Sequence, residues 1–250
     1  MTIGHAVVRL IGPPEADAEY IALRSRGSGD EIEIVHLHDY ERVYSEPGLY
    51  EHIVQELLGC RSPQVAADAF ADALTELALD PSEVVLLDLG AGTGVVGELV
   101  SAVGISTIVG VDALDAARTA CLRDRPGTYA DYLTGDLASP APKLLKALAG
   151  HRPTALISAG ALGGTHGSGA TLVNALALLP AGSPVVFTID ERWMQTDRPG
   201  GFRTVMSDLV ESRQFRLLSR MRFQHRVSTS GEPIYYELVV AVTGSDNLTS

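Results

Sequence analysis

The chain of 250 residues has little of what marks several large protein classes. Its two cysteines, Cys60 and Cys121, are too few for a disulfide framework and do not have the spacing of a metal knuckle. No stretch approaches the roughly 18 uninterrupted apolar residues of a membrane-spanning helix. The first 20 residues also lack a basic start followed by a long apolar run. We therefore expect a cytoplasmic protein with no membrane partner and no metal.

Basic residues are scarce as well. The sequence has 19 Lys and Arg against 31 Asp and Glu, which gives a net charge of −12, and it contains no run rich in Lys or Arg. A surface this acidic repels phosphate backbones. We therefore expect no nucleic-acid partner. With 46% hydrophobic residues, a chain of this length can build one sizeable core and a small appended unit.

The first 80 residues differ in pattern from the rest. Strand-like stretches at residues 5–11 and 31–37 are followed by a helix-like stretch at residues 48–59. Ser62 before Pro63 is typical of a helix N-cap followed by proline at the first helical position. We expect residues 1–80 to form an N-terminal extension and helical cap, and its strands are candidates for holding a homodimer together.

From residue 81 to 250, short apolar runs alternate with amphipathic segments, which predicts a parallel sheet covered by helices on both faces. The predicted strands are residues 84–89, 107–111, 129–133, 155–158, 184–189, 215–227 and 234–242. The predicted helices are residues 94–102, 114–124, 142–149, 170–179 and 202–211. The last two strands read as an antiparallel hairpin at the sheet edge, with Arg216, Arg220, Arg222 and Arg226 on a solvated face. The expected fold is α/β and Rossmann-like: a seven-stranded, mostly parallel sheet with one reversed strand.

The densest chemical signal is a glycine-rich loop after the first strand of this region. Gly90, Gly92 and Gly94 alternate between an apolar strand and a helix, so free N–H groups at the helix start can face a ligand. Gly92, Gly94 and Gly97 also match the dinucleotide fingerprint, and Asp112 follows Gly92 by 20 residues, which suits a ribose hydroxyl. The pattern predicts a nucleotide-like ligand at the carboxyl ends of the strands.

Three successive strands end in carboxylates: Asp88, Asp112 and Asp136. A carboxylate beside the glycine loop repels a pyrophosphate and attracts an ammonium or sulfonium group. Asp136 is suited to accept a hydrogen bond from an exocyclic amine. An NAD-dependent oxidoreductase would fit the glycines but leaves Asp88 and Asp136 without a partner.

With this combination of residues, the chain resembles the class I S-adenosylmethionine-dependent methyltransferases over about residues 84–242. The resemblance implies S-adenosylmethionine as the cofactor, Asp112 as the residue that holds both ribose hydroxyls, and the loop at Gly135 beside the adenine. The positions it assigns to the cofactor are Asp88, Gly90, Ala91, Gly92, Thr93, Gly94, Asp112, Ala113, Gly135, Asp136, Leu137 and Ser158. Residues 156–167 are also similar to a segment of the Williams-Beuren syndrome chromosome-region methyltransferase-like proteins.

The acceptor is less clearly indicated. Methyltransferases that act on nucleobase or glutamine nitrogens usually carry an Asn/Asp-Pro-Pro-aromatic motif after strand four, whereas residues 158–161 here read Ser-Ala-Gly-Ala. We therefore expect methyl transfer to an O, N or C nucleophile of a small molecule. A catalytically silent S-adenosylmethionine-binding protein is the other alternative.

Three residues are candidates for handling the acceptor. His166, in a glycine-rich stretch, has a side chain that titrates near working pH and is a candidate base, unless it only orients substrate or faces solvent. Asp190 ends a strand and could bind an amine, although helix capping or an ion pair with Arg192 is the alternative. Tyr44 could close over the donor or simply pack in an aromatic core.

Overall fold

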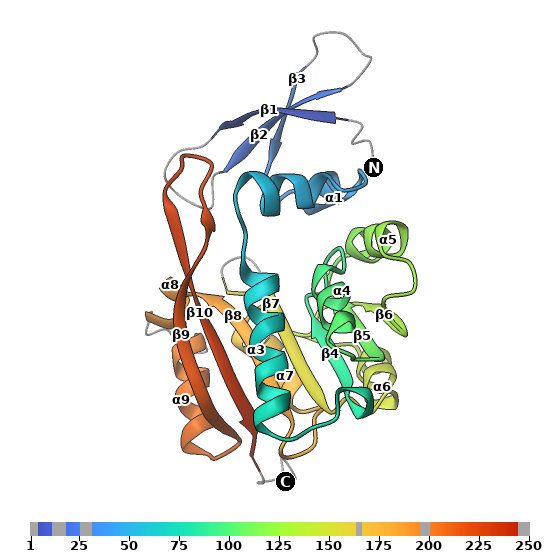
Figure 1. The fold of residues 1–250 in the computed structure, drawn as a ribbon, viewed down its shortest axis with the longest axis vertical. Coiled ribbons are helices and arrows are strands. Elements are labelled where there is room, and N and C mark those ends of the chain that lie inside the picture. The colour runs from blue at the N-terminus through green and yellow to red at the C-terminus, as the bar shows by residue number, and fades with distance from the viewer. Residues whose placement is uncertain (1–4, 12–18, 26–31, 164–166, 196–200, 245–250) are drawn as a thin grey trace.

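The computed structural model describes residues 5–11, 19–25, 32–163, 167–195 and 201–244, and they form two sheets (Figure 1). The larger sheet has seven strands in the order β6-β5-β4-β7-β8-β10-β9. Its strands are β4 (Val85–Leu89), β5 (Thr107–Asp112), β6 (Asp131–Thr134), β7 (Ala155–Leu162), β8 (Pro184–Asp190), β9 (Phe215–Val227) and β10 (Pro233–Thr243). Strands β4 to β8 run parallel, and β10 runs antiparallel to both of its neighbours. The predicted α/β fold with one reversed strand is confirmed.

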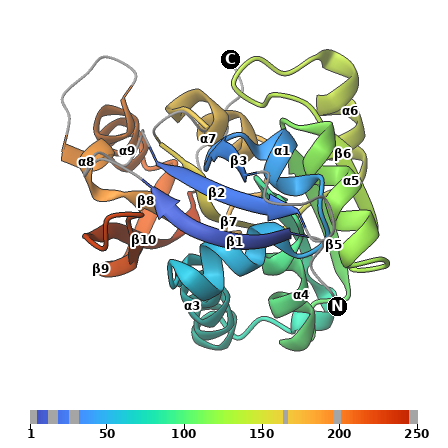
Figure 2. The ribbon, with the colours of Figure 1, turned by 90° about the horizontal axis from the view of Figure 1, so that it is seen from above.

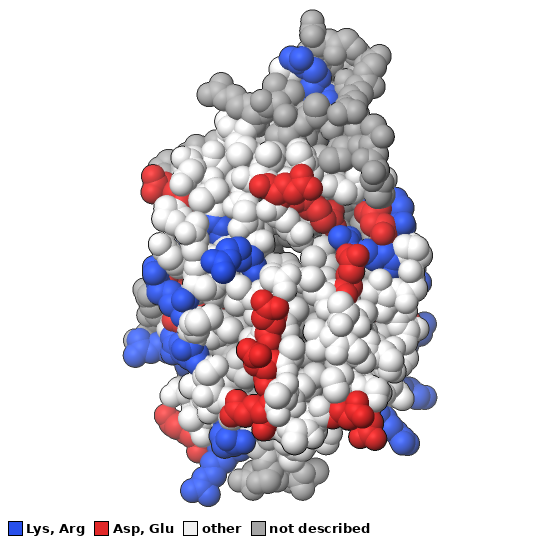
Figure 3. Space-filling view, in the orientation of Figure 1, with Lys and Arg blue, Asp and Glu red and all other residues white. Residues whose placement is uncertain are grey.

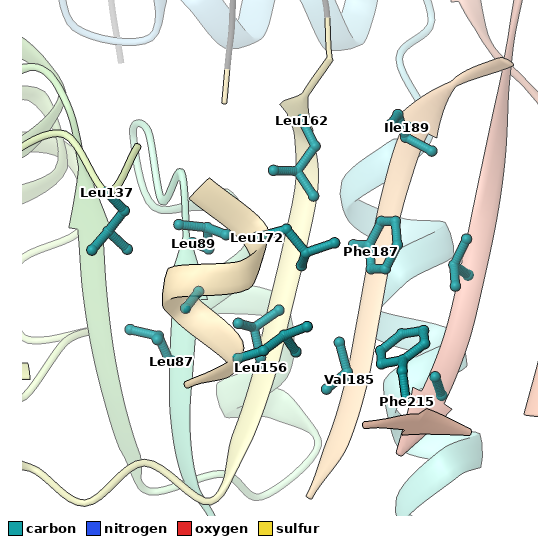
Figure 4. Packing of buried hydrophobic residues seen from close by; sticks show 14 of the residues in the cluster. Leu87, Leu89, Leu137, Leu156, Leu162, Leu172, Val185, Phe187, Ile189 and Phe215 are labelled. Atoms are coloured by element: carbon teal, nitrogen blue, oxygen red, sulfur yellow. The ribbon is translucent and has the colours of Figure 1, made fainter. Parts of the chain in front are cut away.

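Helices cover both faces of this sheet (Figures 1 and 2). Six of them supply most of the cover: α3 (Ser62–Glu76), α4 (Val95–Ala102), α5 (Asp115–Asp124), α6 (Pro142–Gly150), α7 (Gly169–Leu176) and α9 (Phe202–Glu211). Because side chains alternate along a strand, Leu87 packs toward α6 and α7 while its neighbour Leu86 packs toward α3 and α4, and both are fully buried. Figure 4 shows Leu172 of α7 lying over Leu156 and Phe187 in the first of these cores.

Helix α3 belongs structurally to the larger sheet. Its Phe70 is fully buried against the face formed by residues such as Ile157 and Val186. Burying a side chain of this size contributes roughly 1.5–3 kcal/mol. The division of the chain at residue 80 stays a prediction. A short 3-10 turn, η3 (Pro81–Glu83), connects α3 to β4, and α8 (Glu191–Gln195) follows β8.

A smaller unit, here called the cap, lies above the carboxyl ends of the parallel strands (Figure 1). It consists of β1 (His5–Ile11), β2 (Tyr20–Ser25), β3 (Ile32–His36), α1 (Tyr40–Tyr44), α2 (Leu49–Glu51) and the π-helix η2 (His52–Leu57). The three strands pair antiparallel in the order β1-β2-β3. Ile21, Val35 and Ile53 belong to the cap's own apolar core.

Two local predictions for this region need correction. Strand β2 was not expected, because its Ala and Leu residues favour helices and only its pairing with both neighbours makes it a strand. Ser62 does not cap a helix: α3 begins at Ser62 with Arg61 as its N-cap and no side-chain capping bond. The expected helix at residues 48–59 is present as α2 and η2.

The β9–β10 hairpin extends upward to meet the cap (Figure 1), and two irregularities in its pairing change the expected faces. The register shifts between Ile234 and Tyr235 and again between Val240 and Ala241. The shift beside Tyr235 moves Arg226, expected in solvent, to the buried side of the strand, where it is 7% exposed. Met221, expected on the buried face, shares a face with the buried Phe223 but is 51% exposed on this edge strand. Arg220 and Arg222 remain exposed and pair with Glu237 and Glu191 respectively, as expected of a solvated edge.

Candidate functional site

A cavity of about 670 Å³ lies between the carboxyl ends of the parallel strands and the cap. The cap contributes residues such as Leu37, His38, Asp39, Tyr40, Glu41, Tyr44, Tyr50 and Val54 to its wall. The glycine loop and strand ends contribute Gly90, Ala91, Gly92, Thr93, Asp112, Ala113, Gly135, Asp136, Leu137 and Gly160, and the β9–β10 hairpin contributes His225, Arg226 and Tyr236. A cavity at the strand ends of an open α/β sheet is the usual position for a ligand site.

Glycine is required at two positions of the loop for different structural reasons. Gly90 has φ +72°, and a Cβ at this position would lie only 2.1 Å from the Cβ of Ala161, so the loop packs directly against the end of β7. Gly92 has φ +55°, and its missing side chain faces the Tyr44 hydroxyl across the cavity wall, with 3.4 Å from a built Cβ to that oxygen. Gly90 therefore holds the loop in place, whereas Gly92 keeps backbone open toward the cavity.

Asp112 joins the end of β5 to the glycine loop. Its Oδ2 accepts a hydrogen bond from the Gly92 N–H at 3.0 Å, and its Oδ1 accepts one from the Leu114 N–H at 3.0 Å. Burial raises the pKa of this carboxyl, and the backbone hydrogen bonds from Leu114, Gly92 and Ala113 oppose that rise. A carboxylate held at the cavity wall in this way can accept hydrogen bonds from a diol.

The loop after β6 forms the neighbouring part of the wall. Asp136 is exposed, and its Oδ1 accepts a hydrogen bond from the Ala138 N–H at 2.7 Å. Leu137 is buried beside it, and both line the cavity. This combination of an apolar side chain and an acceptor carboxylate is suited to a flat, amine-bearing ring.

Three of the residues expected to contact a cofactor lie behind the wall, outside the cavity lining of the described residues. Asp88 is fully buried, its Oδ2 accepts a hydrogen bond from the Tyr129 hydroxyl at 2.6 Å, and burial raises its pKa to about 7. The Ser158 hydroxyl donates to the Leu89 carbonyl at 2.8 Å. Gly94 precedes α4, and a Cβ there would lie 2.7 Å from the Cys121 sulfur. These residues support the loop from below.

A polar network ties the cap to the glycine loop. The Thr93 hydroxyl donates to Glu51 Oε1 at 2.5 Å, and Arg125 donates to the same oxygen at 2.8 Å and to the Thr93 carbonyl at 3.0 Å. The Arg123 guanidinium donates to the carbonyls of Tyr44 and Ser45. These contacts position the cap over the loop, and no local sequence pattern indicates them.

The three predicted catalytic residues fare differently. His166 lies outside the described residues. Asp190 is buried in a bidentate ion pair with Arg192 and is not among the residues that line the cavity in the described part of the chain, so its catalytic role stays a prediction. Tyr44 lines the cavity, and burial raises its pKa well above the ordinary value, which makes its hydroxyl a donor and not a base.

A cluster of residues that no local sequence pattern indicates lies at the other end of the cavity. His225 Nδ1 lies 2.7 Å from the Ser62 hydroxyl, and the His225 ring stacks on Tyr236 with centroids 3.8 Å apart. Arg226 lines the cavity and pairs with Glu19, which is fully buried. The contacts of His225 with Ser62 and of Arg226 with Glu19 join residues more than 160 positions apart, so local periodicity carries no signal for them.

Comparison with solved structures shows which fold this is. The chain is 15% identical to an S-adenosylmethionine-dependent methyltransferase from Anabaena variabilis, with a TM-score of 0.53 over 85% of this chain and 96% of that one. It is 18% identical to a proposed RNA methyltransferase from Pyrococcus horikoshii, with a TM-score of 0.52 over 74% of this chain and 87% of that one. This is the Rossmann-like fold of the class I methyltransferases.

The same fold also matches the cyclase SpnF, at 18% identity and a TM-score of 0.51 over 73% of this chain and 83% of that one. At these identities the likeness concerns the fold, and function has to be argued from the site. A scan against protein-family models and a search of curated proteins found no match. Among the described helices, none is long and apolar enough to cross a membrane.

Proposed function

We propose that this protein is an S-adenosylmethionine-dependent methyltransferase that acts on a small molecule. The observation that carries the proposal is the position of Asp112. Its carboxylate holds the Gly92 N–H on the wall of the large cavity, at the strand ends of a class I methyltransferase fold. The glycine loop and this carboxylate together form one side of a nucleoside site.

The residues present fit this donor. Asp112 would accept hydrogen bonds from the ribose hydroxyls, Leu137 and Asp136 would hold the adenine, and the backbone at Gly92 leaves room for the amino-acid end. Once bound, the donor supplies a methyl carbon on a positively charged sulfur, which reacts with a nucleophile held in line with the C–S bond. The protein's own task is to orient the two partners and exclude water, for which the cap is suitably placed.

The charge of the lining favours a sulfonium donor over a dinucleotide. Among the described lining residues, Asp39, Glu41, Asp112 and Asp136 carry carboxylates, whereas Arg226 is the one guanidinium and is paired with Glu19. A pyrophosphate would meet repulsion from these acids with little compensation, and a cation would be attracted. This argues against the NAD-dependent alternative.

Two observations support a small acceptor. The cavity volume of about 670 Å³ falls within the roughly 300–1,000 Å³ of small-molecule sites. On the face shown in Figure 3, acidic side chains lie over α3 and basic ones gather over β9 and the helices beside it, where Arg220 and Arg222 are paired with acids. An RNA acceptor, suggested by the Pyrococcus horikoshii neighbour, would need a basic track toward the cavity.

The finer likeness to the Williams-Beuren syndrome chromosome-region proteins draws no support from these neighbours and stays a prediction.

The proposal is tested by measuring binding of S-adenosylhomocysteine by calorimetry, with NADH as the competing ligand. Asp112→Ala should weaken binding roughly tenfold to hundredfold, because a hydrogen bond to a charged group contributes about 1.5–3 kcal/mol. Asp131→Ala is the matched control, since Asp131 begins β6 at the amino ends of the parallel strands, away from the cavity, and bonds to His151. Tighter binding of NADH than of S-adenosylhomocysteine, or equal loss in both variants, would contradict the proposal. A donor that binds with no transfer to any small-molecule panel would favour a catalytically silent protein.

A further inference from the structure

The β9–β10 hairpin carries a β-bulge where it reaches the cavity. Arg226 pairs with Ile234 and Gln224 pairs with Tyr235, which leaves His225 as the extra residue between them. A bulge of this kind redirects side chains, and consecutive residues His225 and Arg226 are here both 7% exposed and both line the cavity. In a regular strand they would point to opposite faces.

The His225 ring is held in place from several sides. Its Nδ1 lies 2.7 Å from the Ser62 hydroxyl at the start of α3, and its plane stacks on Tyr236 at 15° with centroids 3.8 Å apart. A Cβ built on Gly160, where β7 meets the cavity, would lie 3.9 Å from His225 Cε1. The ring is therefore fixed next to the strand end at which the glycine loop packs.

The walls around His225 are aromatic. The Tyr44 and Tyr50 ring centroids lie 5.1 Å apart, Tyr40 lies 5.3 Å from Tyr44, and Tyr236 stacks on His225 itself. Burial raises the pKa of each of these tyrosines above its ordinary value, so they remain protonated donors at neutral pH. Flat aromatic walls with hydroxyl donors suit a planar ring that carries an oxygen.

We propose that this end of the cavity binds a planar, phenol-type acceptor and that His225 Nε2 takes the proton from its hydroxyl group. The inference rests on the proposed methyltransferase function and adds the substrate class and the base. In the step, the acceptor O–H bond breaks, an Nε2–H bond forms, and the electron pair stays on the oxygen, which becomes the nucleophile. Ser62 is the positioning residue: it accepts from Nδ1–H, which leaves the lone pair on Nε2.

Arg226 supports the developing negative charge. It is paired with Glu19 in a buried contact, yet its positive charge still lowers the pKa of Tyr40, Tyr50 and Tyr236 against the rise caused by their burial. The same field would stabilise a phenolate oxygen placed among these rings. The pKa of Cys60, 3.7 Å from His225 Nδ1, is raised to about 11 by burial, so this thiol does not compete as a base.

The test uses the full chain loaded with S-adenosylhomocysteine and p-nitrophenol as the probe, because only the ionised probe absorbs visible light. The bound probe should ionise at a pH at least one unit below that of the free probe, which is a tenfold change in proton affinity. His225→Gln should remove most of this shift, with the part due to Arg226 left, and should leave the affinity for S-adenosylhomocysteine within about twofold. Ser62→Ala retains the base and should lose part of the shift, and it carries the test if circular dichroism shows that His225→Gln does not fold.

Two control variants sharpen the result. His52→Gln removes a histidine of the cap that pairs with Glu56 outside the cavity lining, and His151→Gln removes one bonded to Asp131 at the far edge of the sheet. Both should keep the full shift. Failure of the wild-type protein to bind the probe, an unchanged shift in His225→Gln, or loss of the shift in His52→Gln would overturn the inference. Calorimetry with S-adenosylhomocysteine on the same samples reports separately on the proposed function.

Discussion

Asp88→Asn should change how the stability of this protein depends on pH. Asp88 is fully buried under the glycine loop, and burial raises the pKa of its carboxyl from 3.8 to about 7. The unfolded chain therefore loses this proton near pH 4, while the folded protein keeps it until about pH 7. Because the folded state binds more protons in this window, its stability falls as pH rises from 4 to 7.

The size of the effect follows from the same pKa change. Each pKa unit corresponds to about 1.4 kcal/mol, so the ionised carboxylate at pH 8 costs the wild-type protein on the order of 4 kcal/mol. Asparagine remains neutral at all these pH values, and its amide oxygen can accept the hydrogen bond from Tyr129. Asp88 Oδ1 has no hydrogen-bond partner among the residues that the structure describes, and an amide N–H₂ in its place would carry a constant cost of about 1–3 kcal/mol. The pH dependence of the difference in unfolding free energy therefore reports the ionisation of Asp88, whereas the size of that difference at a single pH also contains this constant cost.

The assay is urea unfolding followed by circular dichroism between pH 4 and 8 for both proteins. The free energy of unfolding of Asp88→Asn should increase relative to that of the wild type as pH rises. Most of this relative increase should be complete by pH 8. Asp80→Asn is the control of opposite sign, because hydrogen bonds from Ser82 lower the pKa of Asp80, and its contribution is lost as pH falls. Parallel pH profiles for the wild type and Asp88→Asn would refute the reasoning.

Other substitutions test the packing that forms the site. Glu19→Ala leaves the buried Arg226 unpaired and should cost about 3–5 kcal/mol in urea unfolding, whereas a double change of Glu19 and Arg226 to Met should regain most of it; equal losses in both proteins would contradict this. Gly90→Ala forces a Cβ against Ala161 in a left-handed conformation, so it should lower the melting temperature and weaken S-adenosylhomocysteine binding; wild-type values for both would contradict it. Phe70→Ala should cost about 3–5 kcal/mol through the cavity left between α3 and the sheet, and a loss below about 1 kcal/mol would show that this layer is not tightly packed.

The part of the fold that follows local rules could be predicted from the sequence. Strands such as β4 and β5, each apolar on both faces, and the loop from Gly90 to Gly94 are signalled within a dozen residues, and the structure places them as expected. The position of Asp112 beside the glycine loop also follows from the sequence, because one helix and one strand separate the two. The sequence therefore predicts the geometry of the proposed donor half of the cavity.

The proposed acceptor half of the cavity depends on long-range pairing and could not be predicted. Alternation along residues 215–227 suggested that Arg226 faces solvent, but the bulge at His225 reverses the expected side of the strand. The sequence around Ser62 predicts a helix cap. Nothing near Ser62 indicates that its hydroxyl instead forms a hydrogen bond with a histidine 163 positions away. Such contacts depend on the whole fold, and neither hydrophobic periodicity nor a motif in the separate segments predicts them.

The three carboxylates at successive strand ends take different states because their burial differs. Asp88 is fully buried, has its pKa raised to about 7 and supports the loop, Asp112 is partly buried and faces the cavity, and Asp136 is exposed at its rim. In the proposed function, selection of a cationic donor over a pyrophosphate therefore depends on Asp112, Asp136 and the acids of the cap, and Asp88 adds little to it. It follows that neutralising Asp88 should alter stability far more than donor affinity, whereas neutralising Asp112 should do the reverse.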